Sequence, residues 1–284
     1  IKEWAESVGF ASNDAYHFSF AVACASLILS IAIYYIFRPT FRHVEGGVAK
    51  AGEAVQTEQE LSPSETNNRI IALCLVFAVV IFFWMAFHQN GLTLTYFADE
   101  FTAKSSSGIE SMAFDVFNLV AIIFIVYALF SLFQSKKGRT KTISALVIVL
   151  SCVYLYYRYT TLEGDVAVSA PIFQHFNPFY VVALTPVSMA IFGSLARKGK
   201  EPSAPRKIAY GMLVAAIGFG VMAAGSLSLP SPDAQKAAGD AAVFVSPNWL
   251  ITTYLVLTFG ELLLSPMGIS FVSKVAPPKY KGMM

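Results

Sequence analysis

One acidic residue, Glu261, lies near the middle of a long apolar stretch, Pro247–Pro278, that is long enough to cross a bilayer. An ionisable side chain at that depth is costly, so it normally faces a protein interior or a watery cavity and marks a substrate or proton path. Its small and polar neighbours recur at three- and four-residue spacing, which places them on one stripe of a helix: Tyr254, Thr258, Ser265 and Gly268. This pattern indicates a transport site.

The alternative for Glu261 is a packing contact in which a neighbouring helix satisfies the carboxylate. The same stretch contains Pro266, which removes a backbone hydrogen bond and is expected, together with Gly268, to act as a hinge. Both interpretations of the acid stay open on these residues alone.

Two further windows carry side chains that can do chemistry. Trp84 and His88 share a helix face, and Gly91 extends it as an expected hinge; the imidazole can carry a proton near neutral pH or can simply bond a neighbouring helix. Asn177 precedes a proline, so it can bond a ligand or merely mark a helix start. Pro186 is expected to kink the same helix, at a carbonyl that neighbours or water must satisfy.

Several kinds of site are not expected. The sequence has no glycine-rich phosphate loop with a lysine, and no His, Cys or carboxylate cluster with metal spacing, so we expect no ATP site, no metal and no organic cofactor. Gly211, Gly218 and Gly225 recur every seven residues, which indicates close helix packing and not a ligand site. We therefore do not expect an enzyme.

These residues must be positioned by helices in a membrane. The chain has 284 residues, of which 56% are hydrophobic and 13% charged, whereas a soluble domain carries about 25% charged residues. We expect Arg38-Pro39 to end the first span and the second span to continue as helix through Gly91–Thr102. The composition predicts an all-α integral membrane protein with seven transmembrane helices, at about 15–37, 69–89, 112–134, 141–157, 174–196, 207–229 and 247–278.

The distribution of basic residues supports this count. With seven spans, sixteen of the twenty Lys and Arg residues fall on one side, in the segments 38–69, 135–141, 197–207 and 274–284. Short cytoplasmic loops collect such residues. The pattern predicts a multi-pass protein of the cell membrane (inner or plasma membrane), with residue 1 outside and residue 284 in the cytoplasm. The chain begins at Ile1 and stops soon after a basic loop, which we interpret as an internal fragment of a longer protein.

Four stretches resemble helices of the proton-dependent oligopeptide transporter (POT) family of the major facilitator superfamily, in the family's order. FGELLLSP followed by GIS and KVAP resembles its tenth helix, and FWMAFHQNGLTLTYFA its seventh. QHFNPFYVVALTPVSMAIF resembles its eighth helix, and the segment 205–222 its ninth. The resemblance implies a fragment of the major facilitator fold.

The resemblance also implies roles for residues. Glu261 and Asn177 would hold the amino terminus of a peptide, and Ser265 and Trp84 would line the pocket. Gln89 and Tyr254 complete the predicted substrate-binding set, whereas Glu261 and His88 are the candidates for proton coupling. The implied function is proton-coupled symport of di- and tripeptides by alternating access.

The resemblance predicts a division of the chain into parts. Residues 1–37 would end the N-terminal bundle as a helix-six-like span, 38–68 would form a cytoplasmic linker, and 69–284 would form the C-terminal bundle, with helices like the seventh to the tenth and an inserted hairpin at 112–157. The sequence departs from the family pattern at His88, where members often have a carboxylate, and in the placement of this extra hairpin.

The implied partners are small peptides, the lipid bilayer and a missing N-terminal bundle of the same protein, without nucleic acid. Two alternatives stay open: a transporter of nitrate or another organic solute on the same scaffold, and a non-transporting membrane subunit, such as a sensor, in which Glu261 only packs.

Overall fold

The computed structural model describes residues 7–41, 62–162 and 164–277. Contacts divide the chain into two units, 1–60 and 61–284. The first unit contains helix α2, Ser12–Phe41. The predicted end of this helix at Arg38-Pro39 is wrong, because α2 includes Pro39 and continues to Phe41; the proline removes only its own backbone hydrogen bond, two residues before the helix ends. Most of the predicted linker 38–68, and the tail from 278 onward, lie outside the described residues.

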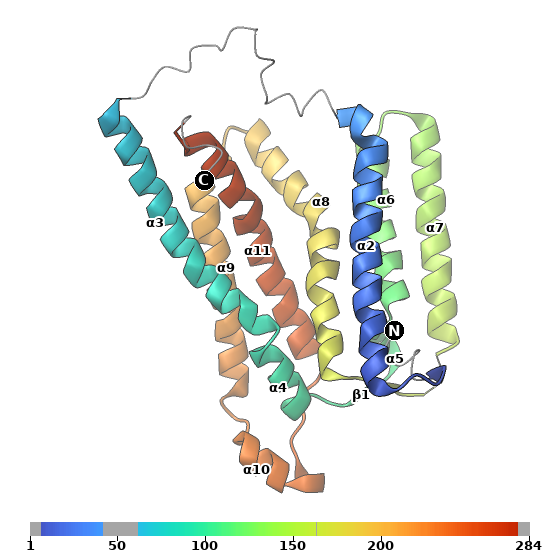
Figure 1. Ribbon diagram of the computed structural model, residues 1–284. Helices are drawn as coiled ribbons and strands as arrows, with labels where there is room; N and C mark the ends of the chain where they lie inside the picture. The colour runs from blue at the N-terminus through green and yellow to red at the C-terminus, as the bar shows by residue number, and fades with distance from the viewer. Residues whose placement is uncertain (1–6, 42–61, 163, 278–284) are drawn as a thin grey trace. The chain divides into compact units, whose positions relative to one another are not determined.

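The second unit is built from long helices joined by short helices and one pair of strands (Figure 1). The long helices are α3 (Pro63–Phe87), α6 (Val116–Gln134), α7 (Gly138–Thr160), α8 (Phe176–Arg197), α9 (Ala204–Ser226) and α11 (Asn248–Val275). The short elements are η1 (His88–Asn90), α4 (Thr93–Phe101), β1 (Ser105–Ser106), α5 (Gly108–Ser111), η2 (Met112–Phe114), β2 (Val166–Ala167), η3 (Ala170–His175), α10 (Pro232–Ala237) and η4 (Gly239–Ala241).

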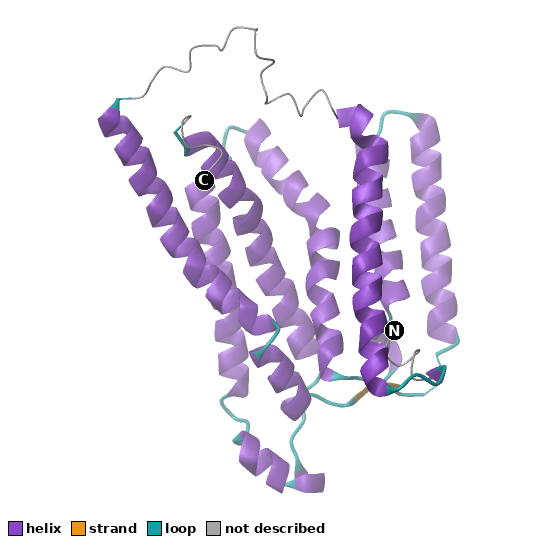
Figure 2. Ribbon diagram, in the orientation of Figure 1, coloured by secondary structure: helices purple, strands orange, loops and turns teal. Residues whose placement is uncertain are grey.

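Within the described residues, seven helical segments are long and apolar enough to cross a membrane, which confirms the predicted all-α membrane class and the seven spans. Helices dominate these residues, and the paired strands β1 and β2 are short and antiparallel (Figure 2). The arrangement of a major facilitator fold and the predicted division into parts stay predictions.

The second span is not the continuous helix that we predicted. α3 ends at Phe87, a turn of 3₁₀ helix follows at His88–Asn90, and α4 begins only at Thr93. The amide of Gly91 donates to the carbonyl of His88 at 3.2 Å, a contact that closes a tighter turn than an α-helix makes. Apolar composition and length therefore identified the span but not the interruption inside it.

The most extensive helix contact joins α9 and α11. A Cβ atom added at Gly211 would lie 2.7 Å from the carbonyl oxygen of Gly260, and one at Gly218 would lie 3.1 Å from Val256. Gly225 faces the indole of Trp249 in the same way. The seven-residue glycine repeat is thus a close-packing face, as predicted, because only a missing side chain lets the backbone and side chains of α11 approach α9 so closely.

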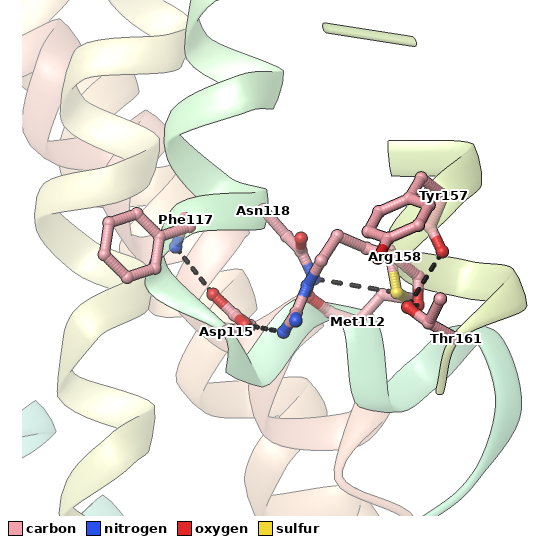
Figure 3. A network of polar contacts seen from close by, with 7 residues as sticks. All are labelled: Met112, Asp115, Phe117, Asn118, Tyr157, Arg158 and Thr161. Carbon is pink, nitrogen blue, oxygen red and sulfur yellow. Dashed lines mark hydrogen bonds and ion pairs between the residues drawn. The ribbon is translucent and has the colours of Figure 1, made fainter. Parts of the chain in front are cut away.

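α6 and α7 form the predicted hairpin, and α6 also packs against α8. Ser144 donates to the hydroxyl of Ser131 at 3.0 Å between the two helices. At the other end, Asp115 caps α6 by accepting from the amide of Phe117 at 2.8 Å and pairs with Arg158 of α7 (Figure 3). A half-buried network therefore closes the end of the hairpin at which α6 begins.

Candidate functional site

Glu261 is half-buried on α11 and accepts a hydrogen bond from Asn177 of α8. The Nδ2 atom of Asn177 donates to Glu261 Oε2 at 3.0 Å and to Thr258 Oγ1 at 3.1 Å. Thr258 is fully buried, one turn before the acid. The structure therefore brings together the acid and the amide that the sequence singled out, and it adds Thr258, which lay on the predicted stripe but outside the predicted binding set.

The local sequence explains how Asn177 reaches the acid. Residues Ala170–His175 form the 3₁₀ helix η3, and α8 follows from Phe176, with Pro178 in its first turn. Proline is tolerated there because the first amides of a helix have no intrahelical partner. Phe173 and Phe176 are almost fully buried beside this junction and fix it in the core. Asn177 directly follows Phe176, so this fixed junction holds its side chain towards α11.

A second set of polar contacts surrounds the interruption between α3 and α4. The hydroxyl of Tyr254, on α11, donates to the carbonyl of Asn90 at 2.8 Å. Gln174, from η3, donates to Thr95 Oγ1 at 3.1 Å and to the carbonyl of Gly91 at 3.4 Å. A membrane leaves few other partners for carbonyls that an interrupted helix frees. Sequence reasoning gave Gln174 no role, although it lies three residues before Asn177.

Tyr254 is 1% exposed and its hydroxyl is already bonded within the protein. A contact between Tyr254 and a substrate stays a prediction, and the structure gives this side chain a packing and bonding role at the interruption. Ser265 lies half-buried one turn beyond Glu261.

The predicted residues of α3 gather at its end. Trp84 is half-buried and its ring lies 5.6 Å from the exposed ring of His88. Gln89 accepts from the hydroxyl of Thr93 at 2.6 Å and so bridges the start of α4. Their contacts are local to α3 and α4, and their roles towards substrate and proton stay predictions.

The predicted hinges lie in different backbone settings. Gly91 lies in the interruption itself. Pro186 lies inside α8, whose axis changes direction partway along its length (Figure 1). Pro266 and Gly268 lie inside α11, which is helical throughout Asn248–Val275. Whether any of these positions moves stays a prediction.

Two apolar hollows flank α9. One, of about 550 Å³, lies between α9 and the first turns of α11, with Trp249 and Gly225 in its wall. The other, of about 560 Å³, lies between α9 and the α3–α4 segment, with Gln89, Thr93 and Ser226 as its polar members. Glu261 lines neither hollow, and lies half-buried where α11 contacts Asn177 of α8.

Comparison with known proteins gives consistent matches. A family model described as POT family matches residues 150–284. Dipeptide and tripeptide permease B of Salmonella typhimurium is 26% identical over 289 residues, which cover 96% of this chain and 51% of that protein. Peptide transporter YePEPT of Yersinia enterocolitica is 36% identical over 112 residues, which cover 39% of this chain and 20% of that protein.

A crystal structure of peptide transporter POT covers 94% of this chain and 51% of its own, at 22% identity and a TM-score of 0.36, which is too low to establish a common arrangement of helices. The chain spans about half the length, or less, of the curated relatives that it matches.

Proposed function

We propose that this chain is a member of the POT family, whose model matches residues 150–284, and that it is the part of a proton-coupled symporter that binds the amino end of di- and tripeptides. The observation that carries the proposal is the pair formed by Glu261 and Asn177, a membrane-embedded carboxylate held at 3.0 Å by an amide from another helix. The names of the matched relatives, which include dipeptide and tripeptide permeases, support peptides as the substrate class.

Glu261 suits an ammonium group. A peptide's amino terminus carries one positive charge, and the Asn177 bond already orients one carboxylate oxygen. Two unit charges about 4 Å apart attract by ~4 kcal/mol at an effective dielectric constant of about 20. Asn177 itself has a carbonyl oxygen that can accept a second N–H of the same ammonium group. A carboxylate and an amide oxygen together distinguish a free amino terminus from an acylated one.

Protons are proposed to enter through the same acid and through His88. Glu261 can exist as a carboxylate that holds the ammonium group or as a neutral acid that releases it, so that its protonation and peptide binding exclude each other. His88 is exposed at the start of η1, with its ring 5.6 Å from that of Trp84, and it is the second candidate for carrying a proton. The proton is thus the proposed coupling ion.

The other wall of the site is proposed to come from the N-terminal bundle of the same protein, since symporters of this kind bind substrate between two halves. We propose that the protein lies in the inner or plasma membrane, and its basic loops support residue 1 outside and residue 284 in the cytoplasm. Small peptides and bilayer lipids are its proposed partners.

The test is uptake of a labelled dipeptide by the whole protein in liposomes with an inward proton gradient. Glu261→Gln keeps the size of the side chain but removes its charge. Loss of a hydrogen bond to a charged group costs about 1.5–3 kcal/mol, so we expect at least a tenfold loss of affinity. Asp165→Asn is the matched control, because Asp165 is an exposed acid outside the spans.

Wild-type uptake by Glu261→Gln would contradict the assignment. Competition identifies the solute: di- and tripeptides should block uptake, whereas free amino acids, N-acetylated peptides and nitrate should not. Uptake that is blocked by nitrate and not by peptides would replace the peptide by another solute. Absence of any gradient-driven uptake would favour a non-transporting subunit.

A further inference from the structure

The Glu261–Asn177 pair and the helix interruption at 88–92 are joined by a closed ring of hydrogen bonds. Asn177 ties α8 to α11 through Glu261. Tyr254 ties α11 to the carbonyl of Asn90. Gln174 ties the segment that leads into α8 to Thr95, just beyond the interruption. Three elements far apart in sequence are thus each bonded to the other two.

The bonded residues of this ring lie close together along each helix. Tyr254 and Glu261 are seven residues apart on one continuous helix, which is about 10 Å at 1.5 Å per residue. Gln174 and Asn177 are three residues apart across the junction of η3 and α8. A displacement of the acid or of the amide is therefore transmitted over at most two helical turns to a bond on the interruption.

Tyr254 donates to the carbonyl of Asn90. Gln174 donates to Thr95 Oγ1 and to the carbonyl of Gly91, which also accepts from Thr95 Oγ1 at 3.2 Å. Carbonyls at the end of a helix have no intrahelical donor, and in a bilayer an unpaired carbonyl is costly. The two donors therefore fix the angle between α3 and α4, because a change of that angle must break one of these bonds or carry α11 or η3 along. The burial of Tyr254, at 1% exposure, leaves its hydroxyl little room to find another acceptor.

We propose that Tyr254 and Gln174 are positioning residues that couple occupation of Glu261 to the angle of the α3–α4 interruption. An ammonium group bound by Glu261 and by the carbonyl oxygen of Asn177 changes how the Asn177 amide lies against the carboxylate, and a shift of Asn177 carries η3, and with it Gln174. A ligand can bias the angle only through such a difference in contacts between two states. This role rests on the proposed function, in which a peptide supplies the ammonium group.

The coupling can be measured as a distance. In the whole protein in nanodiscs, with its native cysteines replaced, spin labels are attached at Leu75 on α3 and Tyr96 on α4, both exposed. Dialanine is the probe. We expect it to shift the distance distribution in the otherwise unchanged protein. Tyr254→Phe should broaden the distribution without peptide and abolish the response, and Gln174→Leu should do the same.

Matched controls separate this role from a general loss of structure. Tyr210→Phe and Gln134→Leu remove the same groups from exposed sites on other helices and should keep the response. Loss of one hydrogen bond costs about 1 kcal/mol, so dialanine affinity in Tyr254→Phe should fall only about fivefold, whereas the maximal uptake rate should fall more than tenfold. A merely structural tyrosine would lower thermal stability and leave the label response intact, and that result would overturn the proposal.

A final experiment does not depend on which solute the protein transports. If dialanine is neither transported nor able to shift the labels in the unchanged protein, the proposed function fails. The coupling within the ring is then measured by a double-mutant cycle on the distance between the two spin labels. Tyr254→Phe combined with Asn177→Ala should change the distance non-additively. Additive changes would overturn the coupling whatever the transported solute is.

Discussion

The contact between Gly211 and Gly260 gives a prediction whose size follows from the structure. In Gly211→Ala the new methyl group would lie 2.7 Å from the carbonyl oxygen of Gly260, 3.1 Å from Leu264 Cβ and 3.3 Å from Leu263 Cβ. The nearest atom belongs to the backbone, so it cannot move aside as the end of a side chain can. Overpacking of this kind costs about 1–3 kcal/mol.

The matched control lies on the same helix. Gly220 has no atom within 4 Å of an added methyl group, so Gly220→Ala changes helix propensity without a clash. Replacing glycine by alanine inside a helix stabilises the helix by about 1 kcal/mol at either position. The difference between the two variants therefore isolates the overpacking cost, and we expect Gly211→Ala to be less stable than Gly220→Ala by about 1–3 kcal/mol.

The assay is reversible unfolding of the whole protein in mixed micelles, with the two variants measured under one condition. A difference of 1.4 kcal/mol changes the unfolding equilibrium constant about tenfold. Peptide uptake should fall in proportion to folded protein if Gly211 only packs. Equal stability of the two variants would refute the close approach of α9 and α11 on which the position of Glu261 depends.

Two further predictions concern groups at the ends of the spans. Asp115→Asn should keep the cap on the amide of Phe117 and lose the charge that faces Arg158, whereas Asp115→Ala should lose both and be less stable by about 1 kcal/mol; equal thermal stability of the two would contradict the cap. The hydrogen bond from Lys236 to Glu100, at 2.7 Å, raises the pKa of Lys236 above its ordinary 10.5, with attraction to the Glu100 charge as the next cause. The stabilising contribution of this pair is therefore complete below pH 10.5 and is lost as the pH rises through the raised pKa; an NMR titration should show a lower Lys236 pKa in Glu100→Gln, and an unchanged value would contradict this account.

Much of the fold was readable because its signals are local. Apolar runs of sufficient length predicted all seven spans, since a bilayer accepts only segments whose backbone bonds are satisfied internally. The repeat of Gly211, Gly218 and Gly225 predicted a packing face because helix periodicity places such residues on one side. The end of α2 and the interruption after Phe87 were mispredicted, because proline tolerance and a turn of 3₁₀ helix depend on which backbone groups find partners.

The sequence by itself determined that Glu261 lies on a polar stripe of a membrane helix, because composition and a 3.6-residue period act along one segment. Only the tertiary structure decided that Asn177, 84 residues away, donates to that acid, and that Tyr254 and Gln174 hold the interrupted helix beside it. The physical reason is that a hydrogen bond needs its donor and acceptor within about 3 Å, and separation along the chain does not determine separation in space. Packing of α8 and α11 supplies that proximity.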